Sequence, residues 1–279
     1  MWHPAKGKSY DGGEELSMCL ILFAHQLRPD LPLVLLANRD EYLNRATAPL
    51  APWAEAPDVV GGRDLLAGGS WLGVGADGRW AAVTNVREGE PSLPGAPSRG
   101  QLVRDYLLGR DPPAAFVTRL VPRMMAYAGF NLLLGNCTEV WSIGNREPAP
   151  VQLSPGLYGL SNGRLDTPWP KVERGKAALL ALLAEPQPTV EQGFRLLADR
   201  ETFPDQQLPD TGIPLEWERA LSATFIIAPE RGYGTRSSTV LLRVANGETL
   251  MVERTFAGTP ERWSQCSQRL PAASGGRLF

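Results

Sequence analysis

Short apolar runs separated by glycine- and proline-rich turns are the feature that most restricts how this chain can fold. Residues 18–26 and 31–38 flank the turn Arg28-Pro29-Asp30 and predict a hairpin. The dipeptide Asp77-Gly78, which is typical of tight hairpin turns, lies between two further runs of this kind. Strands are predicted at residues 18–26, 31–38, 71–76, 79–85, 129–135, 139–143, 157–160, 223–228, 237–244 and 249–256. We therefore expect a mostly antiparallel sheet built from neighbouring hairpins.

Helical patterns occur in two separate blocks rather than between successive strands. Helices are predicted at residues 98–108, 112–125, 169–184 and 189–199. The run Leu33 to Ala37 is apolar throughout, which is typical of a strand buried on both faces. Two sheets stacked between two helical layers satisfy both patterns, so we predict an α+β fold, a four-layer αββα sandwich. We expect a single domain over residues 18–264 and a flexible C-terminal tail over residues 265–279.

Composition excludes several classes of protein. The net charge of −2 and the pI near 5.8 argue against a nucleic-acid binder. The longest purely apolar run, Ala177 to Ala184, is far shorter than the roughly 18 residues that a membrane span requires. Three cysteines without a CxxC spacing indicate neither a disulfide framework nor a structural zinc site. We expect a cytoplasmic protein without a metal.

Cys19 has two readings. A cysteine inside an apolar strand is usually an inert core residue. Its neighbour Met18 could instead be the true initiator, and removal of that methionine would leave an α-amine with a pKa of about 7.7–8.0 beside a thiol with a pKa of about 8.5. Such an amine can act as the base for its own nucleophile. Only His3 and His25 are present, so a histidine-based triad is poorly supplied.

Polar residues at the ends of apolar runs are the other candidates. Residues 38–41 read either as a solvated strand end or as catalytic groups that include Arg39, Asp40 and Glu41. Asn85, Asn131 and Asn162 read singly as turn formers, and as a set they could donate hydrogen bonds to an oxyanion. Arg236 lies in the polar stretch 233–239, which reads as a turn or as part of a pocket. The glycine pairs near residues 61–64 and 68–73 form either turns or a ligand loop.

These stretches together resemble the NRDE (TANGO2-like) family. The residues that carry the resemblance are Met18-Cys19, 38–41, 61–64, 69–73, 84–85, 159–162, 167–171 and 233–239. They run in order along nearly the whole chain. The family is similar at a distance to choloylglycine hydrolase and penicillin V acylase, which are N-terminal-nucleophile hydrolases of the αββα type.

The resemblance implies a role for each candidate residue. Cys19 would attack a carbonyl and its α-amine would carry the proton. Asn85 and Asn162 would hold the amine or the oxyanion. Arg39 with Asp40 or Glu41, together with Arg236, would orient the nucleophile, and the loose match leaves the choice between the two carboxylates open. Residues 1–17 are then expected to be a non-native or removed extension.

Two functions follow from these expectations. The first is a cysteine N-terminal-nucleophile amidohydrolase-like enzyme that acts on a small amide, ester or thioester and requires no cofactor. The alternative, suggested by the family's link to haem and lipids, is a non-catalytic carrier of haem or an acyl lipid in the same pocket. Haem as a transported ligand would need an axial residue, for which Cys19 and His25 are the candidates. The sequence identifies neither the substrate nor the oligomeric state. We expect Cys19, residues 38–41, Asn85, Asn162 and Arg236 to converge on one concave site.

Overall fold

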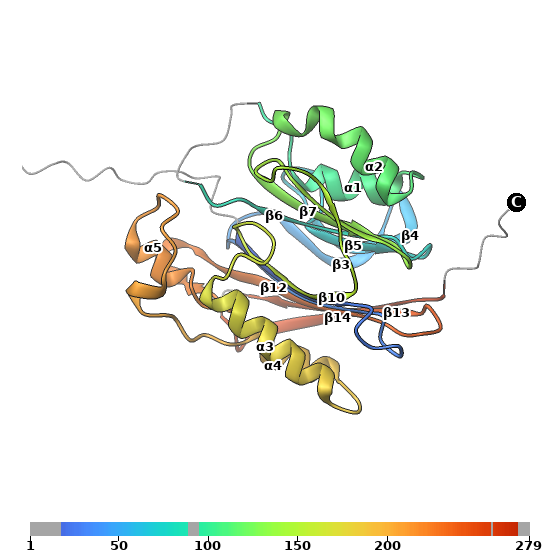
Figure 1. Ribbon diagram of the computed structural model, residues 1–279. Helices are drawn as coiled ribbons and strands as arrows, with labels where there is room; N and C mark the ends of the chain where they lie inside the picture. Colours follow the sequence, from blue (N-terminus) through green and yellow to red (C-terminus); the bar gives the residue numbers. More distant parts are fainter. Residues whose placement is uncertain (1–17, 89–94, 258, 273–279) are drawn as a thin grey trace, which may run out of the picture.

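The computed structural model describes residues 18–88, 95–257 and 259–272. The predicted removal of residues 1–17 therefore lies outside the described residues. Two antiparallel sheets stack face to face, and helices cover the outer face of each (Figure 1). The predicted four-layer α+β sandwich is confirmed.

The first sheet contains the strand that carries Cys19. In spatial order its strands are β10 (Gly156–Leu160), β1 (Met18–His25), β2 (Leu33–Tyr42), β12 (Tyr233–Arg243), β13 (Thr249–Phe256) and β14 (Trp263–Leu270), with β11 (Ile227–Ala228) paired to β12. β1 is thus an inner strand between β10 and β2, and its backbone is hydrogen-bonded on both sides.

The second sheet follows the order of the chain. Its strands are β3 (Thr47–Trp53), β4 (Ala56–Asp64), β5 (Leu72–Gly75), β6 (Trp80–Asn85), β7 (Phe130–Gly135), β8 (Val140–Gly144) and β9 (Val151–Gln152). Each strand pairs with the next, which is the meander that the hairpin signals predict.

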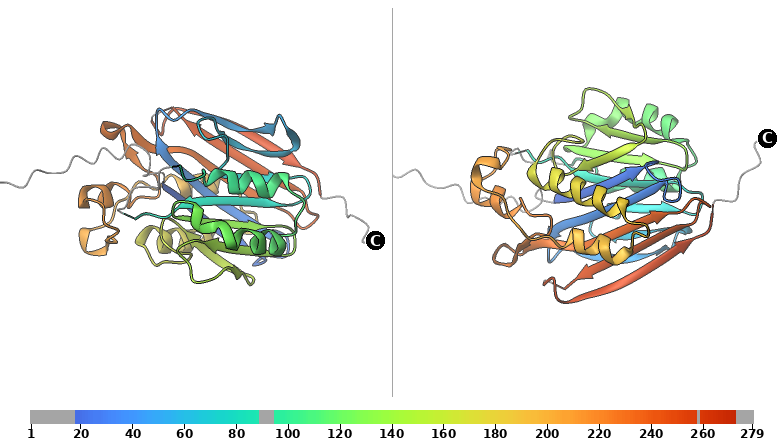
Figure 2. Two further views of the ribbon diagram at one scale, coloured as in Figure 1. Left: turned by 90° about the horizontal axis from the view of Figure 1, so that it is seen from above. Right: turned by 60° about the horizontal axis from the view of Figure 1, so that its bottom comes forward.

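The helices lie in two outer layers and at one end. Figure 2 shows α1 (Gly100–Leu108) and α2 (Pro113–Leu120) on the second sheet, and α3 (Pro170–Ala184) and α4 (Val190–Leu197) on the first. The short α5 (Leu215–Ala220) lies at one end of the sandwich. Three 3-10 helices complete the helical elements of the described residues: η1 (Val121–Ala126), η2 (Asp205–Gln207) and η3 (Pro229–Arg231). None of the helices in the described ranges is long and apolar enough to cross a membrane.

Alternation along β1 explains why this strand is apolar throughout. Successive side chains of a strand point to opposite faces. Ile21 and Phe23 pack between the two sheets, whereas Leu20 and Leu22 pack against α3 and α4. Both faces of the strand are therefore buried, as the run of apolar residues predicted.

The structure corrects several predicted boundaries. Residues 265–270 were predicted to belong to a flexible tail, but they complete β14, which pairs with β13 along its whole length. β14 was missed because it is an edge strand with mostly exposed side chains, so its sequence does not alternate in polarity. Of the predicted strand 223–228, only Ile227–Ala228 is a strand. β3, β4 and α5 were also missed.

Candidate active site

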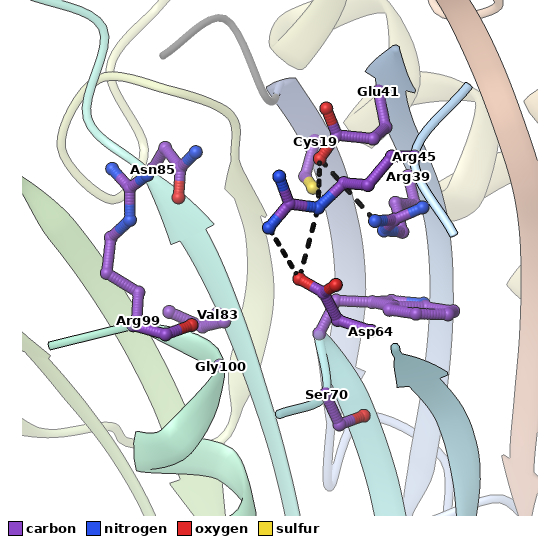
Figure 3. Close-up of a pocket in the computed structure, with 12 residues that line it drawn as sticks. Cys19, Arg39, Glu41, Arg45, Asp64, Ser70, Val83, Asn85, Arg99 and Gly100 are labelled. Carbon is purple, nitrogen blue, oxygen red and sulfur yellow. Dashed lines mark hydrogen bonds and ion pairs between the residues drawn. The ribbon is translucent and has the colours of Figure 1, made fainter. Parts of the chain in front are cut away.

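An open pocket lies where β1 begins and β6 ends. Its empty volume is about 530 Å³, including the solvent at its mouth. Figure 3 shows that side chains from both sheets and from the start of α1 surround it. The residues that line it are Cys19, Arg39, Glu41, Arg45, Asp64, Ser70, Trp71, Val83, Asn85, Ser98, Arg99 and Gly100.

Cys19 is the second residue of β1 and faces this pocket. It pairs directly with Arg39 of β2, and side chains opposite each other in an antiparallel pair share a face. The face is the one that Ile21 and Phe23 continue into the core between the sheets. The hydroxyl of Ser161 donates a hydrogen bond of 3.1 Å to the carbonyl oxygen of Cys19 and so ties the start of β1 to the end of β10.

The thiol of Cys19 is strongly disfavoured as a thiolate. Burial raises its pKa to about 12, and the negative charge of Asp40 adds to this rise. The guanidinium of Arg39 and a hydrogen bond from the Asp40 backbone act in the opposite direction and do not offset the burial. A nucleophilic Cys19 therefore needs a base beside it that takes the proton as the sulfur attacks.

Arg39 and Glu41 form the wall of the pocket on β2. The guanidinium of Arg39 lies 4.3 Å from the ring centre of Trp71, and the residue is 4% exposed. Its hydrogen bonds to the side chains of Glu41 and Thr47 are both long at 3.4 Å. The guanidinium is thus positioned mainly by stacking on the indole.

Arg45 and Asp64 close another side of the pocket. Two nitrogens of Arg45 donate to one carboxylate oxygen of Asp64 at 2.7 and 3.1 Å, and Glu41 lies 3.5 Å from Arg45. Asp64 also accepts backbone hydrogen bonds from Leu66 and Ala67, which orders the loop between β4 and β5. The pair joins the turn between β2 and β3 to the end of β4, where the loop that leads to Ser70 begins.

Asn85 and Asn162 join the two sheets at the site. The side-chain amide of Asn162 donates to the carbonyl oxygen of Asn85 at 2.8 Å, and Arg87 N donates to the carbonyl of Asn162 at 2.8 Å. Thr84 similarly donates to the carbonyl of Ser161. The side-chain amide of Asn85, within the described residues, has no hydrogen-bond partner and lines the pocket, so it can bind a ligand oxygen.

Asp40 lies on the other face of β2, away from the pocket. Its Oδ1 accepts a hydrogen bond of 2.6 Å from Thr235, and its Oδ2 is buried without a partner among the described residues. Burial raises the pKa of Asp40 to about 6, while the charge of Lys171 on α3 works against this rise. Asp40 and Glu41 therefore occupy different environments although they are adjacent in sequence.

Arg236 supports the site from outside the pocket. Its Nη1 donates to the carbonyl oxygens of Tyr42, Leu43 and Arg45 at 2.8, 2.8 and 3.2 Å. It lies at the point where the pairing of β12 with β2 shifts register. Arg236 holds the turn that carries Arg45, and it does not line the pocket.

The predicted site residues thus fall into two groups. Cys19, Arg39, Glu41 and Asn85 line the pocket, and Asp40, Asn162 and Arg236 surround it without lining it. The catalytic roles of all seven remain predictions. Among the residues described, no cluster of His, Cys, Asp or Glu could hold a metal ion.

Sequence reasoning gave no role to several residues at the site. Asp64, Ser70 and Trp71 lie in the two glycine-rich stretches that read as turns or a ligand loop, so a signal for them was present. Lys171 lies in the stretch 167–171, which contributed only to the family resemblance. Arg45 and the start of α1 carried no local signal.

Comparison with known proteins identifies relatives over most of the chain. A family model described as Transport and Golgi organisation 2 matches residues 18–258. The Transport and Golgi organization protein 2 homolog of Bos taurus is 34% identical over 271 residues, which cover 88% of this chain and 96% of the relative. The human homolog is 32% identical, with 86% and 93% covered, and the Drosophila melanogaster protein is 31% identical with the same coverage.

Two solved structures are similar at low sequence identity. One is a mutant of conjugated bile acid hydrolase from Clostridium perfringens, with a TM-score of 0.47, 8% identity, and 89% of this chain and 92% of the other covered. The other is the Caenorhabditis elegans ortholog of N-acylethanolamine-hydrolyzing acid amidase, with a TM-score of 0.36, 13% identity, and 91% and 100% covered.

Proposed function

We propose that this chain, which belongs to the Transport and Golgi organisation 2 family, is a cysteine amidohydrolase-like enzyme that cleaves a small amide, ester or thioester. The observation that carries the proposal is that Cys19 and Asn85 line one pocket. A nucleophile and a neutral donor in the same pocket are the two groups that acyl transfer requires.

The reaction would proceed in two acyl-transfer steps. The sulfur of Cys19 attacks the carbonyl carbon of the substrate while its proton passes to the base, and the carbonyl oxygen becomes an oxyanion held by the amide of Asn85. The bond to the leaving nitrogen, oxygen or sulfur breaks as the base returns the proton to that atom, which leaves an acyl-thioester on Cys19. Water then attacks the thioester, and the carboxylic acid and the free thiol are released.

The α-amine of Cys19 is the base in this proposal. The raised pKa of the thiol argues against a preformed thiolate and for a base that is attached to the nucleophile itself. This base exists only if Met18 is removed and Cys19 becomes the first residue. The family model begins its match at residue 18, which supports that start.

Acylation by a small electrophilic probe tests the proposal on the protein purified from the full coding sequence, with its N-terminus read by intact mass. Cys19 is buried, whereas Cys137 is exposed and Cys266 is partly exposed. An inert Cys19 would react most slowly of the three. We expect Cys19 to be acylated first near neutral pH, in molecules whose N-terminus is Cys19.

Substitution of Cys19 provides the control. Cys19→Ser changes the volume little, so the fold should persist while acylation at this position and turnover of the probe fall sharply. Cys137→Ser should change neither. Acylation of Cys19 no faster than that of Cys137 would overturn the enzyme and favour the alternative, a carrier of haem or an acyl lipid in the same pocket. Retention of residues 1–17 in active protein would exclude the amine as the base.

A further inference from the structure

Lys171 is a buried cation close to the start of β1. It is the second residue of α3 and is 2% exposed. A cation at the N-terminus of a helix is unfavourable, because the helix dipole is positive there. Its Nζ donates to the carbonyl oxygen of Leu221 at 2.9 Å. A buried lysine in such an unfavourable position requires compensation from a nearby negative charge.

The compensating charge is Asp40. It lies on the face of β2 that packs toward the layer of α3, since Asn38 and Leu36 on the same face contact α4 or its core. Burial raises the pKa of Asp40 and lowers the pKa of Lys171, and the charge of each residue opposes the shift of the other. Within the described part of the chain no hydrogen bond joins Asp40 to Lys171, and Oδ2 of Asp40 accepts no hydrogen bond.

The strand register places this acceptor beside the N-terminal end of β1. Met18 pairs with Asp40, and Cys19 pairs with Arg39. Met18 is the residue that pairs with Asp40, so its removal would leave the α-amine of Cys19 at the end of β1, next to that pairing position. In the proposed mechanism, this amine is the group that can donate a hydrogen bond to Oδ2 of Asp40.

Other charged groups surround the pair. Lys171 is also influenced by Arg87, which follows β6, by Glu218 of α5 and by the thiol of Cys19. Arg87 and Glu218 form an ion pair with each other at 2.6 Å, so Asp40 is the carboxylate that compensates the charge of Lys171.

Asp40 has further charged neighbours on its own strand. Arg39 favours its charged form, and Glu41 opposes it. These two are linked to each other at 3.4 Å on the pocket face. Lys171 is the leading charged group that keeps Asp40 ionised.

We infer that Lys171 is a positioning residue that acts through Asp40: its cation keeps Asp40 ionised, and Asp40 accepts a hydrogen bond from the α-amine of Cys19. The inference rests on the proposed function and assigns the acceptor of the amine to Asp40 rather than to Glu41. Because Lys171 touches neither the pocket nor a substrate, its loss should change the pH dependence of the site more than the binding of a probe.

The pH profile of Cys19 acylation tests the inference. The reaction requires ionised Asp40 and therefore fails at low pH. Without the cation the pKa of Asp40 rises further. In Lys171→Met we expect the acid limb of the rate profile to move to higher pH by about one unit, near the lower end of what one adjacent charge produces. The rate should recover to within about threefold of the unsubstituted protein at the upper end of the profile, as expected for a shifted ionisation.

A matched control comes from the same helix. Lys176 pairs with Asp166 at 2.8 Å near the surface, and it is absent from the interactions of Asp40. Lys176→Met removes the same charge from α3 and should leave the acid limb in place. Lys171→Gln, which keeps a donor for the carbonyl of Leu221, provides a second variant if the methionine variant does not fold, and the same shift is expected.

A double-substitution cycle tests the route through Asp40. In an Asp40→Asn background, acylation of Cys19 should be slow at every pH, and Lys171→Met should change this residual rate no further. An unchanged limb in both Lys171 variants, or a further fall in rate when Lys171→Met is added to Asp40→Asn, would overturn the inference while the enzyme proposal stands. Failure of the unsubstituted protein to acylate Cys19 selectively would instead overturn the proposed function, and the role of Lys171 with it.

Discussion

The buried ion pair between Arg87 and Glu218 should respond very differently to single and double substitution. Arg87 Nη1 lies 2.6 Å from Glu218 Oε2, and both side chains are 3% exposed. Glu218 also accepts hydrogen bonds from the amide and the hydroxyl of Thr211. Glu218→Gln keeps an acceptor for Thr211, and it removes the negative charge that Arg87 needs.

The expected loss of stability depends on the contacts that Arg87 keeps after the substitution of Glu218. Breaking a buried pair by removing one charge costs about 3–5 kcal/mol. The ring of Trp169 lies 4.5 Å from the guanidinium and still stabilises it, by up to about 2 kcal/mol in a desolvated site. Arg87 Nε already lacks a partner within the described part of the chain, so the substitution leaves that unmet requirement unchanged. We therefore expect Glu218→Gln to lower the free energy of unfolding by about 3 kcal/mol, at the lower end of the range.

Urea denaturation at neutral pH measures this effect, and the adjacent residue supplies the control. Arg219 pairs with Asp205 at 2.6 Å, and both side chains are more than 40% exposed. Arg219→Gln should leave the free energy of unfolding nearly unchanged, because solvent screens this exposed pair. The double variant Arg87→Met/Glu218→Met should return to within about 1 kcal/mol of the original stability, because no unpaired charge is left. Equal losses for Glu218→Gln and Arg219→Gln would refute the reasoning.

Two further predictions concern a buried carboxyl and a close backbone contact. Burial raises the pKa of Glu253 to about 6. Its stabilising contribution is therefore fully present below pH 4.5 and is lost as the pH rises through 6. Glu253→Gln should remove this pH dependence, which amounts to up to about 2 kcal/mol in the free energy of unfolding measured across that range. A Cβ on Gly69 would clash with the backbone of Gly100, so Gly69→Ala should displace the start of α1 and slow Cys19 acylation. The adjacent Gly68 has open space and a positive φ, so Gly68→Ala should cost only about 1 kcal/mol of thermal stability and spare acylation.

The sequence alone could predict which side chains of a strand share a face at the site. The burial of both faces of β1 and β2 was predicted from their apolar runs, and the same parity places Asp40 and Glu41 on opposite faces. The sequence alone did not say which face would become the pocket, because that depends on which sheet packs against which. The packing of the layers shows that Glu41 lines the pocket, whereas Asp40 lies on the opposite face of β2.

Contacts between distant segments were the part that sequence reasoning could not supply. Arg45 reaches the pocket because Asp64 holds its guanidinium and Arg236 holds the carbonyl oxygens of its turn, and neither Asp64 nor Arg236 is close to it in sequence. The start of α1 enters the pocket because Gly69 and Gly100 pack backbone against backbone. Lys171 contributed only to the family resemblance, because its burial and its interaction with Asp40 depend on how α3 packs on the first sheet.

The position of Cys19 between two charged environments follows from its place near the end of an inner strand. Its side chain points to the pocket, where Arg39 and Glu41 lie, and the residue before it pairs with Asp40, whose charge interacts with that of Lys171. In the proposed mechanism, a thiol on one face and an amine controlled from the other face would allow substrate binding and proton transfer to be adjusted separately. Substitutions on the pocket face should therefore act on probe binding, and substitutions on the helix face should act on the pH at which Cys19 reacts.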